Sequence, residues 1–155
     1  MEEHAAHQAK GSYKLLGIEM AIDFVIMYLV MYTMIATLDH FYLNINTVYM
    51  TLMMVAPMTI LMLIFMRSMY QSRHLNWMIG GGAALVFVAS FAAMRWQAAV
   101  GNEQFLKSMI PHHSGAILMC KQSSITDPEI IKLCREIVKA QETEIAQMQA
   151  ILLRY

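Results

Sequence analysis

Charged residues are scarce in this 155-residue sequence, and the two signs balance. Only 14% of the residues are charged, with 11 lysines and arginines against 11 aspartates and glutamates. An ordinary globular domain has about 25% charged residues. The lack of net positive charge gives no reason to expect a nucleic acid as a partner. Because 58% of the residues are hydrophobic, the composition also argues against one soluble domain.

Three long apolar runs, over residues 15–38, 48–66 and 77–94, predict an all-α protein with three membrane-spanning helices. About 20 apolar residues cross the hydrocarbon of a bilayer, and each run approaches that length. Trp77 and Trp96 flank the third run as aromatic anchors do at a membrane surface. The small residues from Gly80 to Ala84 are expected either to allow close helix contact or to form a loosened first turn of the helix. Residues 15–96 are thus a predicted transmembrane region in the lipid bilayer.

Residues 1–14 are predicted to form a polar N-terminal tail. His4 and His7 could share a helical face as a weak metal site, but a disordered tail is the favoured interpretation. A cleaved signal peptide is not expected, because the next apolar run is too long and lacks a small-residue cleavage site.

Two carboxylates, Glu19 and Asp23, interrupt the first apolar run on one helical face. Carboxylates inside a membrane indicate a functional role, here a relay for cations. The alternative, which we favour, is an ion pair near the membrane surface with Arg67 or Arg73, because the following hairpin returns the chain to the same side.

Methionine is abundant, with 17 residues. In the second run it recurs every four residues, at Met50, Met54, Met58, Met62 and Met66. This repeat resembles, by analogy, the thioether rings of eukaryotic copper transporters. Four-residue spacing drifts around a helix, so packing is the favoured interpretation of most of these side chains.

The basic residues predict the orientation of the chain. Lys10 and Lys14 precede the first run and Arg67 and Arg73 lie in the second joint, whereas the first joint, residues 39–47, has no lysine or arginine. Basic loops remain on the cytoplasmic side. We therefore expect a cytoplasmic N-terminus in a bacterial inner membrane and, after three crossings, a periplasmic region over residues 97–155.

The segment from Met109 to Cys120 concentrates donors for soft metal ions. It holds two histidines, two thioethers and a thiol at helical spacing: Met109, His112, His113, Met119 and Cys120. Such donors suit copper or silver. At about 100° per residue, Met109, His113 and Cys120 fall on an apolar stripe, His112 and Met119 on its flank, and Ser114 on the opposite, polar side.

Two amphipathic helices are predicted around this segment, over residues 102–124 and 127–153. Asp127 as the N-cap and Pro128 as the first helical residue mark the start of the second helix. Gln141 and Glu144 are polar residues on or beside its apolar stripe, so they need partners. Pro111 is expected to kink the first helix beside the histidines.

The register of this hairpin follows from symmetry about its turn. Cys120 then lies level with Cys134, and His113 with Gln141. We predict that mild oxidation joins the two cysteines within the chain, since a disulfide needs Cα atoms within about 7 Å.

The Met-x-x-His-His pattern from Met109, followed by Gln-x-x-Glu-Ile from Gln141, resembles the DUF305 family over roughly residues 102–153. The resemblance implies a ferritin-like helical hairpin and, for members with an assigned role, periplasmic copper or silver binding. Two helices cannot enclose a core alone, so we expect a homodimer that completes a four-helix bundle.

The donor types narrow the choice of metal. The Glu-x-x-His pairs of di-iron bundles do not occur in the sequence. Zinc bound by both cysteines and His113 is the main competitor, whereas thioethers favour Cu(I) and histidine also accepts Cu(II). The expected metal ligands come from both helices: Met109, His112, His113, Met119, Cys120, Cys134, Gln141, Glu144 and Met148.

We therefore expect a membrane-anchored protein without enzymatic activity that sequesters Cu(I) or Ag(I), or passes it to a copper chaperone or an efflux partner. One alternative is a small copper transporter that uses the Met-bearing second run. Another is a structural membrane protein with a zinc site or no metal site.

Overall fold

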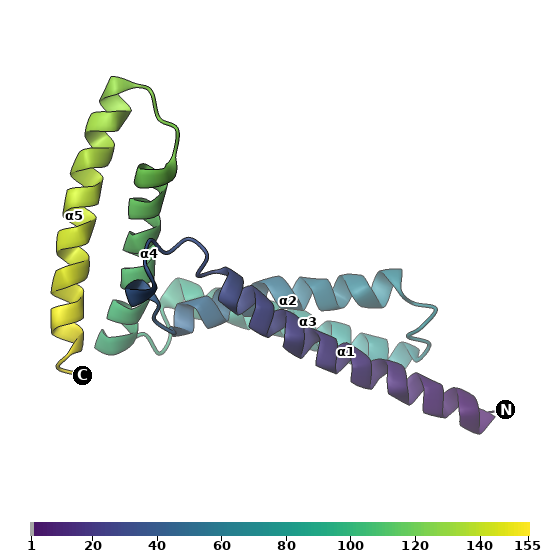
Figure 1. Ribbon diagram of the computed structural model, residues 1–155. Coiled ribbons are helices and arrows are strands. Elements are labelled where there is room, and N and C mark those ends of the chain that lie inside the picture. The colour runs from purple at the N-terminus through teal and green to yellow at the C-terminus, as the bar shows by residue number, and fades with distance from the viewer. Residues whose placement is uncertain (1) are drawn as a thin grey trace. The chain divides into compact units, whose positions relative to one another are not determined.

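The computed structural model describes the backbone of residues 2–155 and the side chains of residues 13–155. This part of the chain is helical and contains no strand, which confirms the predicted all-α class (Figure 1). The elements are α1 (Glu2–Val30), the short 3-10 helix η1 (Leu38–His40), α2 (Ile45–Phe65), α3 (Arg73–Trp96), α4 (Asn102–Gln122) and α5 (Pro128–Leu152). The expectations for His4, His7 and Lys10 fall on side chains outside the described residues.

The chain divides into two compact units. The first comprises the residues up to 29 together with 48–98, and the second comprises residues 30–47 together with 99–155. The first unit therefore contains α1, α3 and most of α2. The second combines the hairpin of α4 and α5 with the connection between α1 and α2.

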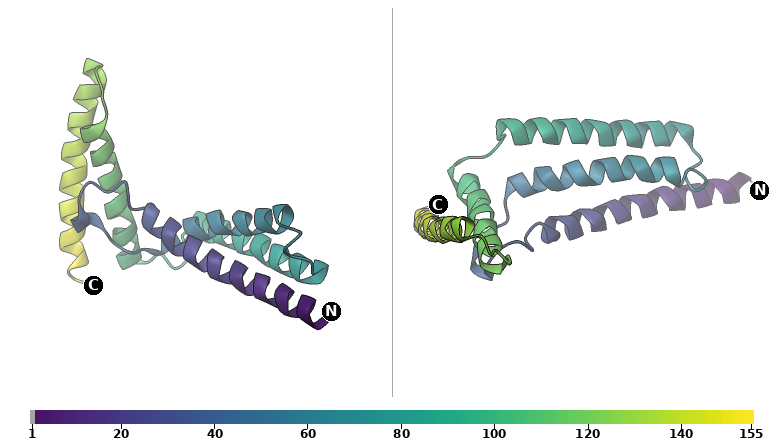
Figure 2. Two further views of the ribbon diagram at one scale, coloured as in Figure 1. Left: turned by 45° about the vertical axis from the view of Figure 1, so that its right-hand side comes forward. Right: turned by 90° about the horizontal axis from the view of Figure 1, so that it is seen from above.

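In the first unit, α1, α2 and α3 lie side by side (Figure 2). Their core contains Leu16, Leu63 and Tyr70, each at most 6% exposed. The Tyr13 hydroxyl donates to Asn76 Oδ1 at 2.7 Å, so this part of α1 lies beside the joint between α2 and α3. Therefore α1 and α3 approach each other near Lys14 of α1 and Arg73 of α3.

Within the described residues, two helices, α2 and α3, are long and apolar enough to cross a membrane. The sequence predicted three such helices. The bounds of the first helix were predicted wrongly at both ends, because α1 begins at Glu2, where a disordered tail was favoured, and ends at Val30 rather than at Leu38. This helix also carries Lys14, Glu19 and Asp23.

The polar and thioether side chains of this unit differ in part from expectation. In the described part of the chain, neither Glu19 nor Asp23 forms an ion pair with Arg67 or Arg73, so the favoured interpretation of the carboxylates is not confirmed. The methionine repeat of α2 lies beside its buried face, which consists of Thr51, Val55, Ala56, Thr59 and Leu63.

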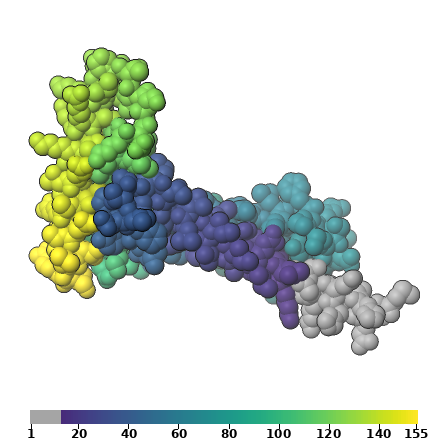
Figure 3. All heavy atoms as spheres, in the orientation of Figure 1, coloured from purple at the N-terminus to yellow at the C-terminus, as the bar shows by residue number. Residues whose placement is uncertain are grey.

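In the second unit, residues 31–44 form a connecting segment that packs against the hairpin (Figure 3). Tyr32 is buried, and its hydroxyl donates to Tyr42 O at 2.8 Å. Asn44 is also buried and its Oδ1 accepts from Thr47 N–H at 2.9 Å, as a residue that caps a helix does. Apolar residues after Val30 are thus used for packing on the hairpin and not for a longer α1.

Candidate metal centre

Two antiparallel helices, α4 and α5, position the candidate site (Figure 1). Their bounds agree with the predicted helices, and the Asp127 side chain accepts from the N–H groups of Glu129 and Ile130, as predicted for an N-cap. Ile110, Ile117 and Ile145 form the buried centre between them. Buried isoleucines from both helices therefore fix the register in which the donors meet.

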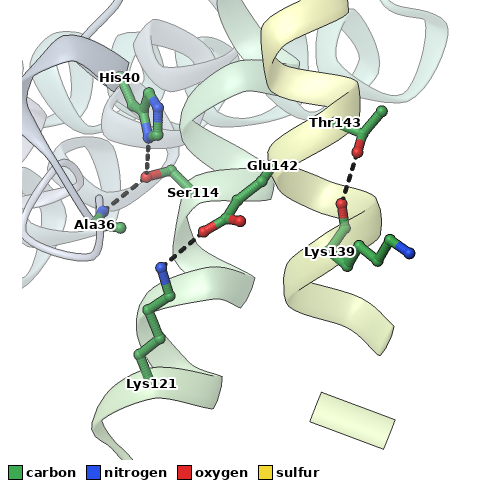
Figure 4. A network of polar contacts seen from close by, with 7 residues as sticks. All are labelled: Ala36, His40, Ser114, Lys121, Lys139, Glu142 and Thr143. Carbon is green, nitrogen blue, oxygen red and sulfur yellow. Dashed lines mark hydrogen bonds and ion pairs between the residues drawn. The ribbon is translucent and has the colours of Figure 1, made fainter. Parts of the chain in front are cut away.

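The buried face of α4 is rotated from the predicted one. Ser114, expected on the polar side, is fully buried at 0% exposure. Its Oγ accepts from Ala36 N–H at 2.7 Å and lies 2.8 Å from His40 Nδ1 (Figure 4). The prediction for Ser114 is wrong because the connecting segment packs on this face of α4. The predicted apolar stripe considered only the two helices of the hairpin and left this segment out.

Cys120 and Cys134 form a disulfide, with Cα atoms 5.3 Å apart. This confirms that the two cysteines lie at one level and that they are joined within the chain. Lys121 and Glu142 link the same two helices near this end, with Nζ and Oε1 2.7 Å apart (Figure 4). Since each sulfur is bonded to the other, neither cysteine presents a thiolate to a metal ion while the bond is intact.

The two adjacent histidines point in different directions. The His113 side chain is 11% exposed, whereas His112 is exposed to solvent. Residues that are neighbours on a helix diverge by about 100°, which explains the difference. The predicted orientation of the pair, with His113 toward the seam, is thus confirmed.

Both ring nitrogens of His113 face an acceptor. Nδ1 lies 3.0 Å from Met109 O, and Nε2 lies 2.7 Å from Glu144 Oε2 on α5. A carbonyl oxygen only accepts, so Nδ1 carries the hydrogen in the first contact. Histidines that bind metals commonly donate their second ring N–H to a carbonyl or carboxylate. The ring is therefore oriented so that Nε2 is the atom directed toward α5.

Two thioethers, those of Met109 and Met148, lie on the turns next to His113 and Glu144. Met109 precedes His113 by one helical turn, and Met148 follows Glu144 by one turn. Because α4 and α5 are antiparallel, both steps lead away from the disulfide end. Both methionines are half-buried, and Met148 also packs against the buried isoleucines. One histidine, one carboxylate and two thioethers thus occupy adjoining turns.

The remaining predicted donors are exposed or lie nearer the disulfide. Met119 is 56% exposed, His112 is exposed, and Gln141 is half-buried, three residues from Glu144 on the side of the disulfide. Within residues 13–155, no three His, Cys, Asp or Glu side chains gather closely enough to hold a metal ion. A complete site in one chain would therefore need thioether donors.

Sequence reasoning missed His40 and the segment around it. His40 lies in η1 and contacts the buried Ser114. The predicted first span assigned the preceding residues to a membrane helix, so no pattern related them to the hairpin. The available signal was the Ser114 hydroxyl, which lies among apolar positions of α4, since a buried hydroxyl needs a hydrogen-bond partner.

Comparison with known proteins gives two matches. The family described as a domain of unknown function (DUF305) matches residues 82–152. Uncharacterized protein L153 from Acanthamoeba polyphaga mimivirus is 35% identical over 112 residues, which cover 71% of this chain and 72% of the viral protein. No solved structure matches the chain. The chain belongs to the DUF305 family.

Proposed function

We propose that this protein is anchored in a membrane and that its hairpin binds Cu(I), with Ag(I) as a close analogue, for sequestration or transfer to a partner protein. The orientation of His113 is the observation that carries the proposal. Its Nδ1 is engaged by a backbone carbonyl, and its Nε2 meets Glu144 of the other helix. Metal-binding histidines are commonly held in this way, with one ring nitrogen bonded to a carbonyl and the other available to the metal ion.

The donor types support copper over zinc. Met109 and Met148 are thioethers on the turns next to His113 and Glu144, and thioethers bind Cu(I) and Ag(I) in preference to harder ions. A structural zinc site would use about four nitrogen or thiolate donors, and the two cysteines are bonded to each other. Bound copper would be the cargo of the protein, held by His113 and the two methionines.

Three features support a transmembrane first unit. Only 6% of the most apolar stretch of α3 is buried, unlike the core helix of a soluble protein. The described part of α1 exposes an apolar stripe at helical spacing: Leu15, Ile18, Ile22, Val25, Ile26 and Leu29. If α2 and α3 both cross the membrane, the start of α2 and the end of α3 lie on the same side of it. The connecting segment precedes α2 and the hairpin follows α3, so both parts of the second unit are then on that side. We propose α1 as a third span, with the N-terminus cytoplasmic.

A homodimer remains part of the proposal. The hairpin exposes large apolar side chains, with Phe105 at 51%, Ile130 at 47% and Leu133 at 53% exposure. A second hairpin would cover such side chains and bring a second set of donors. Light scattering of the purified full chain, with and without Cu(I), measures its molar mass, which should be that of a dimer.

Metal content is the direct test of the function. Full-length protein is purified after growth with copper, silver or zinc salts, and its metal content is measured by elemental analysis. The proposal predicts copper or silver in the wild type and a clear loss in His113→Ala, with a smaller loss in His112→Ala. Zinc retained equally by all three proteins contradicts it.

Topology is tested independently with single cysteines in a Cys120→Ser/Cys134→Ser background. A cysteine at Ser124, in the exposed turn of the hairpin, should react with a membrane-impermeant maleimide on intact spheroplasts. A matched cysteine at Ser68, in the joint between α2 and α3, should react only after the membrane is opened. The reverse pattern contradicts the proposed orientation.

A further inference from the structure

An apolar groove runs between α2 and α3 in the first unit. Its volume is about 670 Å³, which lies within the range of about 300–1,000 Å³ that small-molecule sites occupy. Leu63 and Ile64 of α2 line it on one side, and Gly81 and Ala84 of α3 on the other. The groove is therefore large enough for a ligand with an extended hydrocarbon part.

Small residues of α3 leave this groove open. A Cβ atom at Gly81 would meet no other atom within 4 Å, and one at Gly80 would meet only Leu63 Cδ1, at 4.0 Å. The sequence predicted close helix contact at these residues. The structure shows unfilled space between the helices instead, so the glycines shape the groove.

The groove ends in a cationic mouth. Arg73 lines it and is the first residue of α3. In the described part of the chain the guanidinium has no ion-pair partner, and residues 66–77 contain no Asp or Glu. Burial raises the pKa of Tyr70 in this joint, and the negative charge of Glu19 raises it further.

Two more features of the mouth match a lipid headgroup. The amides of Leu75 and Asn76 bond to Ser72, whereas the amide of Arg73 has no hydrogen-bond acceptor among the described residues. The start of a helix therefore adds a partial positive charge beside the guanidinium. Trp77, at 82% exposure, also lines the groove and is the residue type that anchors helices at the headgroup level.

We propose that this groove binds an anionic membrane phospholipid, with an acyl chain along Leu63, Ile64 and Gly81 and the phosphate at Arg73. Basic pockets between transmembrane helices recognise anionic headgroups by this combination of charges. A second copy of the α2–α3 face is the less suitable occupant, because a symmetric pair would bring two unpaired arginines together. The inference rests on the membrane insertion proposed above.

Native mass spectrometry of the full-length protein in neutral detergent tests the lipid site. Equal amounts of phosphatidylglycerol and phosphatidylcholine are added, and the ratio of the two bound lipids is measured. We expect a preference for phosphatidylglycerol that falls about fivefold in Arg73→Gln, the effect of one basic residue at an anionic surface. Arg67→Gln is the matched control, since Arg67 lies in the same joint but does not line the groove.

A second pair of variants tests the acyl part of the site. Gly81→Leu places a side chain in the open groove and should reduce the binding of both lipids, whereas Gly82→Leu, outside the groove, should not. The proposal is overturned if Arg73→Gln and Arg67→Gln reduce the preference for phosphatidylglycerol equally. It is also overturned if the protein forms a dimer that is lost only in Gly81→Leu. Extraction of the wild type from membranes by alkaline carbonate would contradict the insertion itself, whereas retained protein without lipid preference contradicts the lipid site alone.

Discussion

His113 Nε2 on α4 lies 2.7 Å from Glu144 Oε2 on α5. This contact joins the Met-x-x-His-His and Gln-x-x-Glu-Ile segments, through two residues that are 31 apart in sequence. Glu144 is 52% exposed, and an ion pair with such exposure contributes little to stability, about 0–1 kcal/mol. The contact therefore has more bearing on the orientation of the imidazole than on the stability of the hairpin.

Glu144→Gln separates these two roles. We expect the free energy of unfolding to change by less than about 1 kcal/mol, because the carboxylate is largely solvated. Copper affinity should fall, though less than in His113→Ala, since Glu144 orients the ring or lies at the edge of the site. Chemical denaturation and copper titration of the same preparation measure both effects, and a large loss of stability without a change in affinity would contradict this assignment.

Ser114→Ala should loosen the connecting segment from the hairpin. The change removes the acceptor of Ala36 N–H from a fully buried position. A buried donor left without a partner costs about 1–3 kcal/mol. Hydrogen exchange of residues 31–44 should therefore accelerate.

Ser108→Ala is the control for this prediction. Among the described residues, the Ser108 hydroxyl donates to Gln104 O of its own helix, at 2.7 Å, so exchange of the connecting segment should remain as in the wild type. The same acceleration in both variants would show that the Ser114 contacts do not hold the segment.

Reduction of the Cys120–Cys134 bond should destabilise the hairpin. The bridged residues are 14 apart, and closing a loop of about 15 residues contributes roughly 3 kcal/mol in the chain-entropy account. Thermal unfolding followed by circular dichroism should show a lower midpoint with dithiothreitol. A Cys120→Ser/Cys134→Ser variant should have the lower midpoint with or without reductant, and it should still bind copper. Loss of copper binding in this variant would show that the thiols, and not the thioethers, are the ligands.

The hairpin was predictable because its determinants are local. Local sequence patterns predict the bounds of α4 and α5 and the Asp127 cap. A turn centred near Asp127 then places the two cysteines at the same level. Symmetry about that turn placed His113 level with Gln141, whereas the structure has it in contact with Glu144, three residues further along α5. Symmetry alone did not distinguish Gln141 from Glu144, since these positions differ by less than one helical turn.

The connecting segment was not predictable in the same way. Its residues from Met31 to Leu38 are apolar enough to continue a membrane helix, and only contacts with distant residues decide otherwise. Ala36 meets Ser114, which is 78 residues away in sequence, and Gln149 Nε2 donates to Asp39 O across 110 residues. A helical wheel includes no such partners, so both the end of α1 and the burial of Ser114 were mispredicted.

The central claim is that His113, with the thioethers beside it, binds Cu(I). Competition titration against a Cu(I) chelator measures this most directly, with full-length wild type, His113→Ala, Met109→Leu and the exposed controls His112→Ala and Met119→Leu. We predict a large loss of affinity for His113→Ala and a loss for Met109→Leu that is greater for Cu(I) than for Cu(II), because thioethers favour the softer ion. The controls should change affinity less. Unchanged Cu(I) affinity in a variant that lacks both His112 and His113 would contradict the claim, since the histidines would then be structural.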